Sequence, residues 1–570
     1  MRIALLVTAF MVLNLISACS QDSGTPVSPV PSPSPVPSSS PVAGTGADQI
    51  LLNGKILTVD AQFTIAEAIA IAGERILAVG SNEAIQALAG PATRIRDLEG
   101  RTVVPGLIDN HNHFVRATEQ WYRQVRWDEV DTRREALNKL RQKAAQLPPG
   151  EWIVVLGGWI FEQFSDDQHA FSRQELDQVL PANPVYIQLG YSRGYANSLA
   201  LAATGIDAAT RVADGTLVRD DAGELSGELI GAGAFLRLAA RIPATSDATW
   251  DQSLQLTVDD YLKAGLTTLL DVGGNTVTPR HYEALDRAAA NGLLNLRVFY
   301  TLNAQNVVGA SPEDIIEALE TWAPRSGNDR FGQFTYGEMT YQGIADPAGV
   351  DWNPDQASLD NYGNILKTAA RRGWQIHEHS NRDDKMQAIL GLMAEVNRES
   401  PIAGLRWTIA HAETASDQTI AQAAALGVLF ALHSSAQMGA VAAAQGGEDV
   451  SRVPPIRQIE ASGIIWGLGS DGTVVSGHHP FHDLGWAVSG LARNGEKLLQ
   501  ATVSREAALR AHTINNAYLL FMEDRLGSLE AGKYADLVVL DSDYMSVPEA
   551  RIRDIHPVMT MVNGQLVFEQ

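Results

Sequence analysis

The sequence predicts an α/β fold, in which a (β/α)8 barrel is accompanied by a small β-sandwich built from both chain ends. Three observations support this. Eight short apolar, β-rich runs recur with helical stretches between them, which is the pattern of a (β/α)8 barrel. Histidines and acids stand at the ends of several runs, where barrel active sites lie. The chain has 570 residues, 45% of them hydrophobic, which is enough for a large core.

Residues 1–18 resemble a bacterial secretory signal. Arg2 precedes an apolar run that is too short to span a membrane and ends in Ile16-Ser17-Ala18-Cys19, which resembles a lipobox with Cys19 as the lipidated residue. We therefore expect export and a lipid anchor in the bacterial cell envelope, in the outer membrane facing the periplasm. Membrane contact would be made through Cys19 alone. The alternative is an uncleaved helix with a buried cysteine.

A Pro/Ser-rich stretch follows over residues 19–47. It has almost no large apolar side chain, so we expect a disordered tether in extended, polyproline-like conformations. Cys19 is the only cysteine, which leaves the folded part without a disulfide, a thiolate metal site or a cysteine nucleophile.

Short alternating strands open and close the folded part of the chain. Asn53-Gly54 and Gly73-Glu74 supply turns between the opening strands, and Asn563-Gly564 predicts a hairpin near the C-terminus. Residues 48–104 and 520–570 are therefore expected to form one composite β domain.

The barrel is expected over residues 105–519. Its strands lie within residues 102–111, 266–274, 294–302, 333–341, 373–380, 405–412, 427–434 and 464–472. Gly265, Gly373, Gly427 and Gly463 each end a helix just before the next strand. About 140 residues separate the first strand from the second, which predicts an inserted subdomain at about 115–255.

The overall charge limits the partners. The formal net charge is −23, with no long acidic run, which argues against a nucleic-acid partner and is typical of an acidic, soluble exterior. A small-molecule substrate is therefore expected, and homo-oligomerisation stays open.

Histidines at strand ends predict a metal site. Side chains two apart on a strand face the same way, so His111 and His113 point into the barrel mouth while Asn112 points away. His379 and His411 end two later strands. Imidazole nitrogens suit Zn²⁺ and related ions, and such ions lower the pKa of bound water to about 7. A lone HxH pair is also compatible with buried histidines bonded to the backbone.

These motifs resemble the amidohydrolase superfamily, and within it the amidohydrolase family 3 branch, over residues 48–570. The resembling segments are PGLIDNHNH, GWQIHEH with Asp383 four residues beyond His379, AHAE, SDG and LGSLEAGKYADLVVLD. The resemblance implies hydrolysis of a non-peptide amide or cyclic amide C–N bond with one or two divalent metals. Zn²⁺ is expected, with Mn²⁺ and Fe²⁺ as alternatives. It also implies that His111, His113, His379 and His411 are metal ligands and that Asp471 handles the proton of the attacking water.

The fourth strand departs from the family pattern. Many relatives have a carboxylated lysine there that bridges two metals, whereas this chain has Glu338 in FTYGEMTY. A glutamate carboxylate can also bridge two ions. The alternative is a structural glutamate paired with Arg or Lys inside the barrel.

Several other residues near the expected barrel mouth have a functional and a structural interpretation. Asp471 can transfer protons, and its alternative is to cap the following helix. Trp159, His433, His478 and His479 are predicted substrate contacts or, alternatively, core residues. His377 shares the face of His379, one layer deeper, and is expected to pack there.

Two rival functions remain. Gly190–Gly194 reads GYSRG, a G-x-S-x-G pattern between strand-like residues 184–189 and helix-like residues 196–203, which would make Ser192 the nucleophile of a serine hydrolase. A non-catalytic binding or regulatory lipoprotein on the same scaffold is the other alternative.

Overall fold

The computed structural model describes residues 46–212, 214–274, 277–307, 309–346 and 352–570. The expected signal peptide, Cys19 and the tether up to residue 45 lie outside these residues. Across the described ranges, no helix is long and apolar enough to cross a bilayer.

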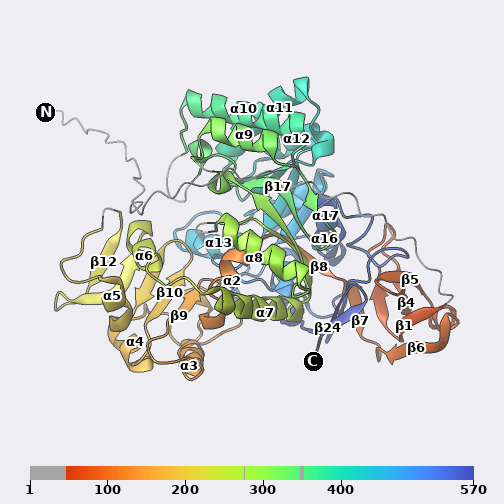
Figure 1. Cartoon of the computed structure of the whole chain (residues 1–570), viewed down its shortest axis with the longest axis horizontal. Helices are drawn as coiled ribbons and strands as arrows, with labels where there is room; N and C mark the ends of the chain where they lie inside the picture. Colours follow the sequence, from red (N-terminus) through yellow and green to blue (C-terminus); the bar gives the residue numbers. More distant parts are fainter. Residues whose placement is uncertain (1–45, 213, 275–276, 308, 347–351) are drawn as a thin grey trace, which may run out of the picture. The chain divides into compact units, whose positions relative to one another are not determined.

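Within the described residues, eight parallel strands form the central barrel, and this confirms the predicted (β/α)8 fold (Figure 1). They pair in sequence order, and a two-residue strand, β16 (Ser326–Gly327), pairs antiparallel with the fourth of them. The barrel strands are β8 (Leu107–Asn112), β14 (Leu266–Asp271), β15 (Arg297–Leu302), β17 (Phe331–Glu338), β18 (Ile376–Ser380), β19 (Thr408–His411), β20 (Leu429–His433) and β21 (Trp466–Gly469).

The first and last strands meet through few contacts, so the barrel is nearly closed. A single parallel bridge joins Asn112 to Gly472. One buried carboxylate supplements it, because Asp109 accepts hydrogen bonds from the backbone N–H of Ser470 at 3.1 Å and from its hydroxyl at 2.5 Å.

Helices alternate with the barrel strands. Gly373 and Gly427 end two of them in the left-handed region, with φ of 76° and 70°, as their positions before strands predicted. The helices are α7 (Asp247–Lys263), α8 (Pro279–Ala290), α9 (Pro312–Thr321), α10 (Gln356–Arg372), α11 (Asp383–Glu399), α12 (Asp417–Leu426), α13 (Ala436–Gln445), α14 (Ile456–Ala461), α15 (Pro480–Ser489), α16 (Arg505–Ala511) and α17 (Ile514–Leu519), with short 3₁₀ turns η3 (Ala304–Asn306), η4 (Gln342–Ile344), η5 (Ala403–Leu405) and η6 (Glu549–Asp554).

The long connection between β8 and β14 holds a separate sheet (Figure 1). Its order is β12-β13-β11-β10-β9, and its core includes Trp127, Trp159 and Phe164. The elements are β9 (Ile153–Leu156), β10 (Val185–Leu189), β11 (Arg193–Ala196), β12 (Thr216–Arg219), β13 (Leu225–Ile230), α2 (Phe114–Thr118), α3 (Arg133–Ala144), α4 (Arg173–Val179), α5 (Ser198–Thr204), α6 (Ala232–Ala239), η1 (Trp121–Arg123) and η2 (Phe161–Gln163).

Strands from both ends of the described chain share one sheet. Its order is β24-β23-β22-β7-β2-β3, and a second sheet, β5-β4-β1-β6, contributes to the same hydrophobic cluster. The elements are β1 (Ala47–Leu52), β2 (Lys55–Leu57), β3 (Ile65–Ala66), β4 (Ala68–Ala72), β5 (Arg75–Gly80), α1 (Asn82–Gln86), β6 (Ala89–Asp97), β7 (Thr102–Pro105), β22 (Leu537–Leu540), β23 (Pro557–Val562) and β24 (Gln565–Glu569).

Two of the three predicted turns are hairpins. Gly73-Glu74 joins antiparallel β4 and β5, and Asn563-Gly564 joins antiparallel β23 and β24. The Asn53-Gly54 prediction is wrong, because β1 and β2 on either side of it belong to different sheets. The chain crosses from one sheet to the other there, and β1 and β2 pair in parallel with β6 and β7.

Candidate metal centre

The carboxylate of Glu338 lies among four histidines. It ends β17 and is buried in the barrel mouth. Its Oε2 lies 3.3 Å from His111 Nε2, 3.1 Å from His379 Nδ1 and 3.5 Å from His411 Nε2. Its Oε1 lies 3.6 Å from His113 Nε2. The structure thus brings together the four histidines and the glutamate that the sequence singled out. The alternative of an Arg or Lys partner for Glu338 is not realised among the described residues.

Asp471 contacts the same group of histidines. It follows β21 with a left-handed φ of 58°, and its Oδ1 lies 3.2 Å from His113 Nε2 and 3.7 Å from His111 Nε2. The helix-cap alternative is wrong, since the next helix begins only at Pro480. A non-glycine residue adopts this conformation at a cost, and the surrounding structure must maintain it.

The alternation of β8 explains why two histidines enter the centre. Asn112, which lies between them, directs its side chain away, where its Oδ1 accepts the hydroxyl of Tyr261 at 2.8 Å. His111 and His113 therefore share the opposite face, as strand geometry predicts.

Outer partners fix the orientation of the histidine rings. His113 Nδ1 lies 2.8 Å from the carbonyl oxygen of Gly273, which can only accept, so Nδ1 donates and Nε2 keeps its lone pair toward the centre. His111 Nδ1 lies 2.9 Å from His377 Nε2. His377 was expected only to pack, and the structure gives it a hydrogen-bonding role.

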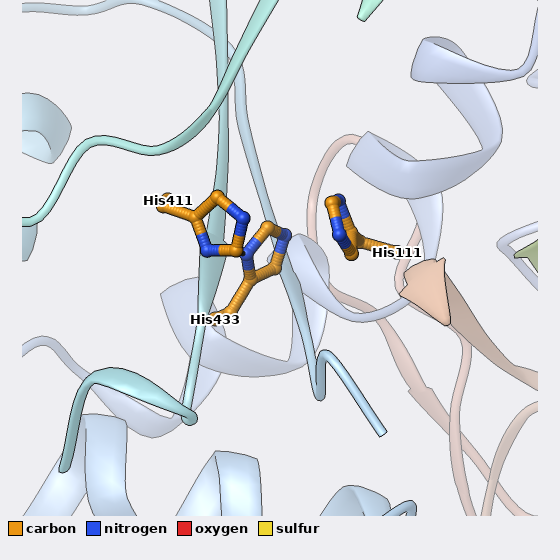
Figure 2. Close-up of side chains that lie close together, drawn as sticks. All are labelled: His111, His411 and His433. Carbon is orange, nitrogen blue, oxygen red and sulfur yellow. Dashed lines mark hydrogen bonds between the residues drawn. The ribbon is translucent and has the colours of Figure 1, made fainter. Parts of the chain in front are cut away.

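His433 joins the centre from the end of β20. Figure 2 shows its ring beside those of His111 and His411, and the ring centroids lie 4.2 Å and 4.6 Å from it. Its Nδ1 lies 3.1 Å from His411 Nδ1. Metal-compatible groups are formed by His111, His411 and His433, by His111, His113 and Asp471, and by Glu338, His379 and His411.

Several buried nitrogens in this centre have no hydrogen-bond partner among the described residues. They are the Nε2 atoms of His111, His411 and His433. An unpaired buried polar atom is costly, and imidazole nitrogens with carboxylate oxygens are the donor set of Zn²⁺ and related ions. The side chains therefore fit a divalent metal.

The charges in the centre match this fit. Burial opposes ionisation of Glu338, but the histidines, His111 first, hold its pKa well below the usual range. Burial also opposes ionisation of Asp471, but the hydrogen bond from His113 and the charge of His411 outweigh it and lower the pKa of this carboxyl group. Burial holds the pKa of His433 well below its ordinary value, so this ring is neutral. For His411, burial is outweighed by Glu338 and Asp471, which raise its pKa to about 9, so the two carboxylates favour a positive charge in the centre and His411 would have to lose its proton to bind a metal.

A buried lysine supports the His379 side of the centre. Lys385 Nζ lies 3.0 Å from both Asp346 and Glu378 and also donates to the carbonyl of His379. Burial opposes its charge, but Glu378 and Asp346 outweigh this and raise its pKa. The sequence gives little indication that Lys385 is buried, because a lysine in the first turn of a helix is usually exposed to solvent.

The inserted subdomain reaches the loop that follows Asp471. Arg126 Nη1 donates to the carbonyl of Thr473 at 2.8 Å, and its Nε and Nη2 bind both oxygens of Asp128 at 2.8 Å and 2.6 Å. Burial opposes ionisation of Asp128, yet Arg126 lowers its pKa to about 2. We call these two residues the Arg126–Asp128 pair. Sequence analysis missed it because its contacts span about 350 residues.

Three predicted substrate contacts, Trp159, His478 and His479, have other partners in the structure. Trp159 is buried in the core of the inserted subdomain, where its Nε1 donates to the carbonyl of Gln188 at 2.9 Å. His478 is fully buried and stacks on Tyr261, with ring centroids 4.2 Å apart. His479 is the residue before α15. Neither histidine is an ion-pair partner of Glu338 in the described chain, and a role of the three residues in substrate binding stays a prediction.

Ser192 lies in an exposed turn rather than in a nucleophile elbow. Its Oγ donates to the carbonyl of Leu189 at 3.1 Å, and the antiparallel strand β11 separates Ser192 from the expected helix, which begins only at Ser198. The strand–turn–helix geometry that exposes a nucleophilic serine is therefore missing from this part of the described chain.

Comparison with known proteins agrees with this geometry. The chain is 28% identical over 552 residues to the N-substituted formamide deformylase of Arthrobacter pascens, covering 92% of this chain and 98% of that protein. Its fold is similar to that of a metal-dependent hydrolase from Pyrococcus furiosus, with a TM-score of 0.62 at 18% identity over 87% of this chain and 100% of that one. It is also similar to atrazine chlorohydrolase TrzN from Arthrobacter aurescens TC1, solved with zinc, with a TM-score of 0.51 at 16% identity over 91% and 95%.

The sequence itself matches a protein family over most of its length. Residues 94–568 match the amidohydrolase family, which confirms the resemblance seen in the motifs. The chain therefore belongs to the amidohydrolase family and is a hydrolase that acts on carbon–nitrogen bonds.

Proposed function

We propose that the chain is a metal-dependent hydrolase that cleaves an amide or cyclic amide C–N bond of a small molecule, outside peptides. The position of Glu338, with its two oxygens within 3.6 Å of four histidines, carries the proposal. In this proposal Glu338 would help to hold one or two divalent ions, and Zn²⁺ is the first choice because nitrogen donors predominate. The ligands are His111, His113, Glu338, His379 and His411.

A bound divalent ion supplies an acidified water and polarises the scissile carbonyl. The chain supplies the proton transfer. Asp471 is ionised and lies at the edge of the ligand group, so one of its Oδ atoms can take a proton from water and return it to the leaving nitrogen. The Arg126–Asp128 pair holds the backbone just after Asp471 and keeps this carboxylate in place.

The inferred substrate class follows from similarity. The Arthrobacter pascens relative is named for N-substituted formamides, and this chain covers 98% of it. We therefore propose N-substituted formamides as the first compounds to test, followed by other amides and cyclic amides.

The proposed location is the bacterial cell envelope. The lipobox-like Ile16–Cys19 segment supports export, with a lipid anchor on Cys19 and the enzyme facing the periplasm from the outer membrane. Expression with Cys19→Ser and cell fractionation tests this, since the substitution should release the enzyme from the membrane fraction. Protein that stays membrane-bound would contradict the anchor.

Elemental analysis tests the metal centre directly. Wild-type protein should carry one or two divalent ions per chain, and Glu338→Gln should carry fewer, because an amide lacks the charge and the second acceptor oxygen of a carboxylate. Glu320→Gln, at a half-exposed glutamate paired with Arg371, is the matched control and should keep the wild-type metal content. Wild-type protein that binds no metal, even after reconstitution with zinc or manganese, would overturn the proposal.

Turnover is tested on the same preparations. Hydrolysis of an N-substituted formamide should stop when a chelator removes the metal and return when zinc is added. Activity that resists chelation, or that survives undiminished in Glu338→Gln, would contradict metal-dependent catalysis.

A further inference from the structure

A small cavity lies beside the metal centre and is lined by the loops that carry it. Ser434, which directly follows His433, forms one wall. Ser476 forms another, and its hydroxyl donates to the carbonyl of Ser470, the residue before Asp471. The remaining lining comes from α15, from η6 and from the loop after α15, which contributes Arg493.

Arg493 is buried in this cavity without adequate partners. Its side chain is 9% exposed, and its Nε and Nη2 atoms have no hydrogen-bond partner in the described chain. Its ion pair is with Asp131 Oδ1, 3.5 Å from Nη2, and that carboxylate is 81% exposed. An exposed acid at this distance offsets little of the cost of burying a guanidinium.

Charged groups of both signs surround Arg493. Arg553 also lines the cavity and donates to the backbone carbonyl of Arg493 at 3.5 Å. Asp128 lines it too, but both its oxygens are already bound by Arg126. Glu549 lies on the exposed rim.

Burial lowers the pKa values of Arg493 and His482 with different consequences for their charge. Burial, and next Arg553, lower the pKa of Arg493 to about 10, so the guanidinium stays charged at neutral pH. Burial, followed by His479 and Arg493, holds the pKa of His482 well below its ordinary value. His482 therefore contributes a neutral wall.

We propose that this cavity binds a small oxyanion, a carboxylate or inorganic phosphate, through the guanidinium of Arg493. Its volume is about 30 Å³, room for about two water molecules and so for a single anionic group rather than a whole substrate. A planar guanidinium pairs with such groups through two parallel hydrogen bonds, which would satisfy the unpartnered Nε and Nη2 atoms.

The anion has two possible sources. It is either a carboxylate carried by the substrate, held while the amide lies at the metal centre, or a free anion that occupies the cavity by itself. A substrate carboxylate as the source rests on the proposed function, whereas the binding of an anion in the cavity does not. The walls favour the first, because Ser434 and Ser476 belong to the same loops as His433 and Asp471.

Calorimetric titration tests binding without any need for turnover. Acetate and inorganic phosphate are titrated at constant ionic strength into purified protein, both as isolated and after chelator treatment. Both preparations should bind at least one of the anions saturably. Arg493→Gln should weaken binding at least tenfold, the loss expected for hydrogen bonds to a charged group.

Two further variants serve as a control and as a replacement for a cavity variant that does not fold. Arg457→Gln, an exposed arginine paired with Glu460, should bind like wild type. If circular dichroism shows that Arg493→Gln is unfolded, Arg553→Gln replaces it and should also weaken binding. The proposal is overturned by wild-type protein that binds neither anion, by equal affinity in the folded cavity variant and wild type, or by binding that vanishes when the metal is removed.

A matched pair of amides separates the two sources. The pair is one N-formyl amine with a carboxylate and its neutral analogue. A tenfold or greater fall in the ratio of their kcat/KM values in Arg493→Gln assigns the cavity to a substrate carboxylate. An unchanged ratio with weakened phosphate binding assigns it to a free anion. Absence of turnover on both amides would count against the proposed function and leave the calorimetric result standing.

Discussion

Asp109 and Ser470 join the first and last barrel strands through two hydrogen bonds that end on one carboxylate. The same carboxylate accepts the backbone N–H of His111 at 3.2 Å and the amide of Asn112 at 2.9 Å. It thus connects the residue before Asp471 with the strand that carries two of the proposed metal ligands. Asp109 therefore contributes both to closure of the barrel and to the geometry of the centre.

Replacing that carboxylate should therefore damage stability and metal binding together. In Asp109→Asn, the amide nitrogen faces donors and leaves at least one buried donor unpaired, which costs about 1–3 kcal/mol. Urea denaturation should show a fall of this size in the free energy of unfolding, and calorimetry should show weaker zinc binding. Ser470→Ala removes only the hydroxyl donor, so a larger loss there than in Asp109→Asn would contradict this account.

Asp471 should affect turnover far more than metal content. Asp471→Asn keeps the shape but cannot accept a proton, so kcat should fall about 10²- to 10⁴-fold. Steady-state kinetics and elemental analysis of the same sample check this. Loss of an ion in the variant would instead make Asp471 a ligand, consistent with its place beside His111 and His113. An unchanged kcat would exclude it from proton transfer.

His377 should set metal affinity through His111. His377→Phe removes the nitrogen 2.9 Å from His111 Nδ1, so zinc affinity should fall about 10- to 100-fold. His377→Gln can restore a hydrogen bond and should recover part of this loss. His169→Phe, at an exposed histidine, is the control and should leave the affinity unchanged. Wild-type affinity in His377→Phe would show that the ring only packs.

Asp128 should make stability depend on acid pH. Its folded pKa of about 2 lies below the ordinary value of 3.8, so the stabilisation is complete above about pH 5 and is lost as pH falls toward 2. The shift corresponds to about 2 kcal/mol. Asp128→Asn should therefore be less stable than wild type at pH 7 by at least that amount, and the difference should shrink below pH 4.

Thermal melts from pH 7 to pH 3 measure this difference. Asp417→Asn, at an exposed surface aspartate, should follow wild type throughout. A constant difference between wild type and Asp128→Asn over the whole range would show that the carboxylate is not stabilised by ionisation.

The barrel was predictable because its signals are local. Each strand is a short apolar run, and glycines such as Gly373 and Gly427 mark helix ends by their own conformational freedom. The positions of His111 and His113 on one face follow from the two-residue period of a strand. Glu338 was expected next to them because the carboxyl ends of parallel barrel strands meet at the same end of the barrel.

The parts that escaped prediction depend on contacts distant in sequence. Nothing near Arg126 indicates that it donates to the carbonyl of Thr473, and nothing near His433 shows that its ring lies 4.2 Å from that of His111. The prediction of a hairpin turn at Asn53-Gly54 was wrong for a related reason, since a turn motif does not show whether its flanking strands belong to the same sheet.

The contact between the Arg126–Asp128 pair and the loop after Asp471 limits which changes the inserted subdomain can tolerate. Gly157 and Gly158 of the inserted subdomain also touch the loop after the last strand, where Gly158 N–H donates to the carbonyl of Val474 at 3.2 Å and a Cβ on Gly157 would overlap that oxygen. The subdomain is consequently not a detachable module. A protein that exchanged it for another would have to change residues 472–477 at the same time, so the two segments should vary together among relatives, and grafts that move only one should lose activity.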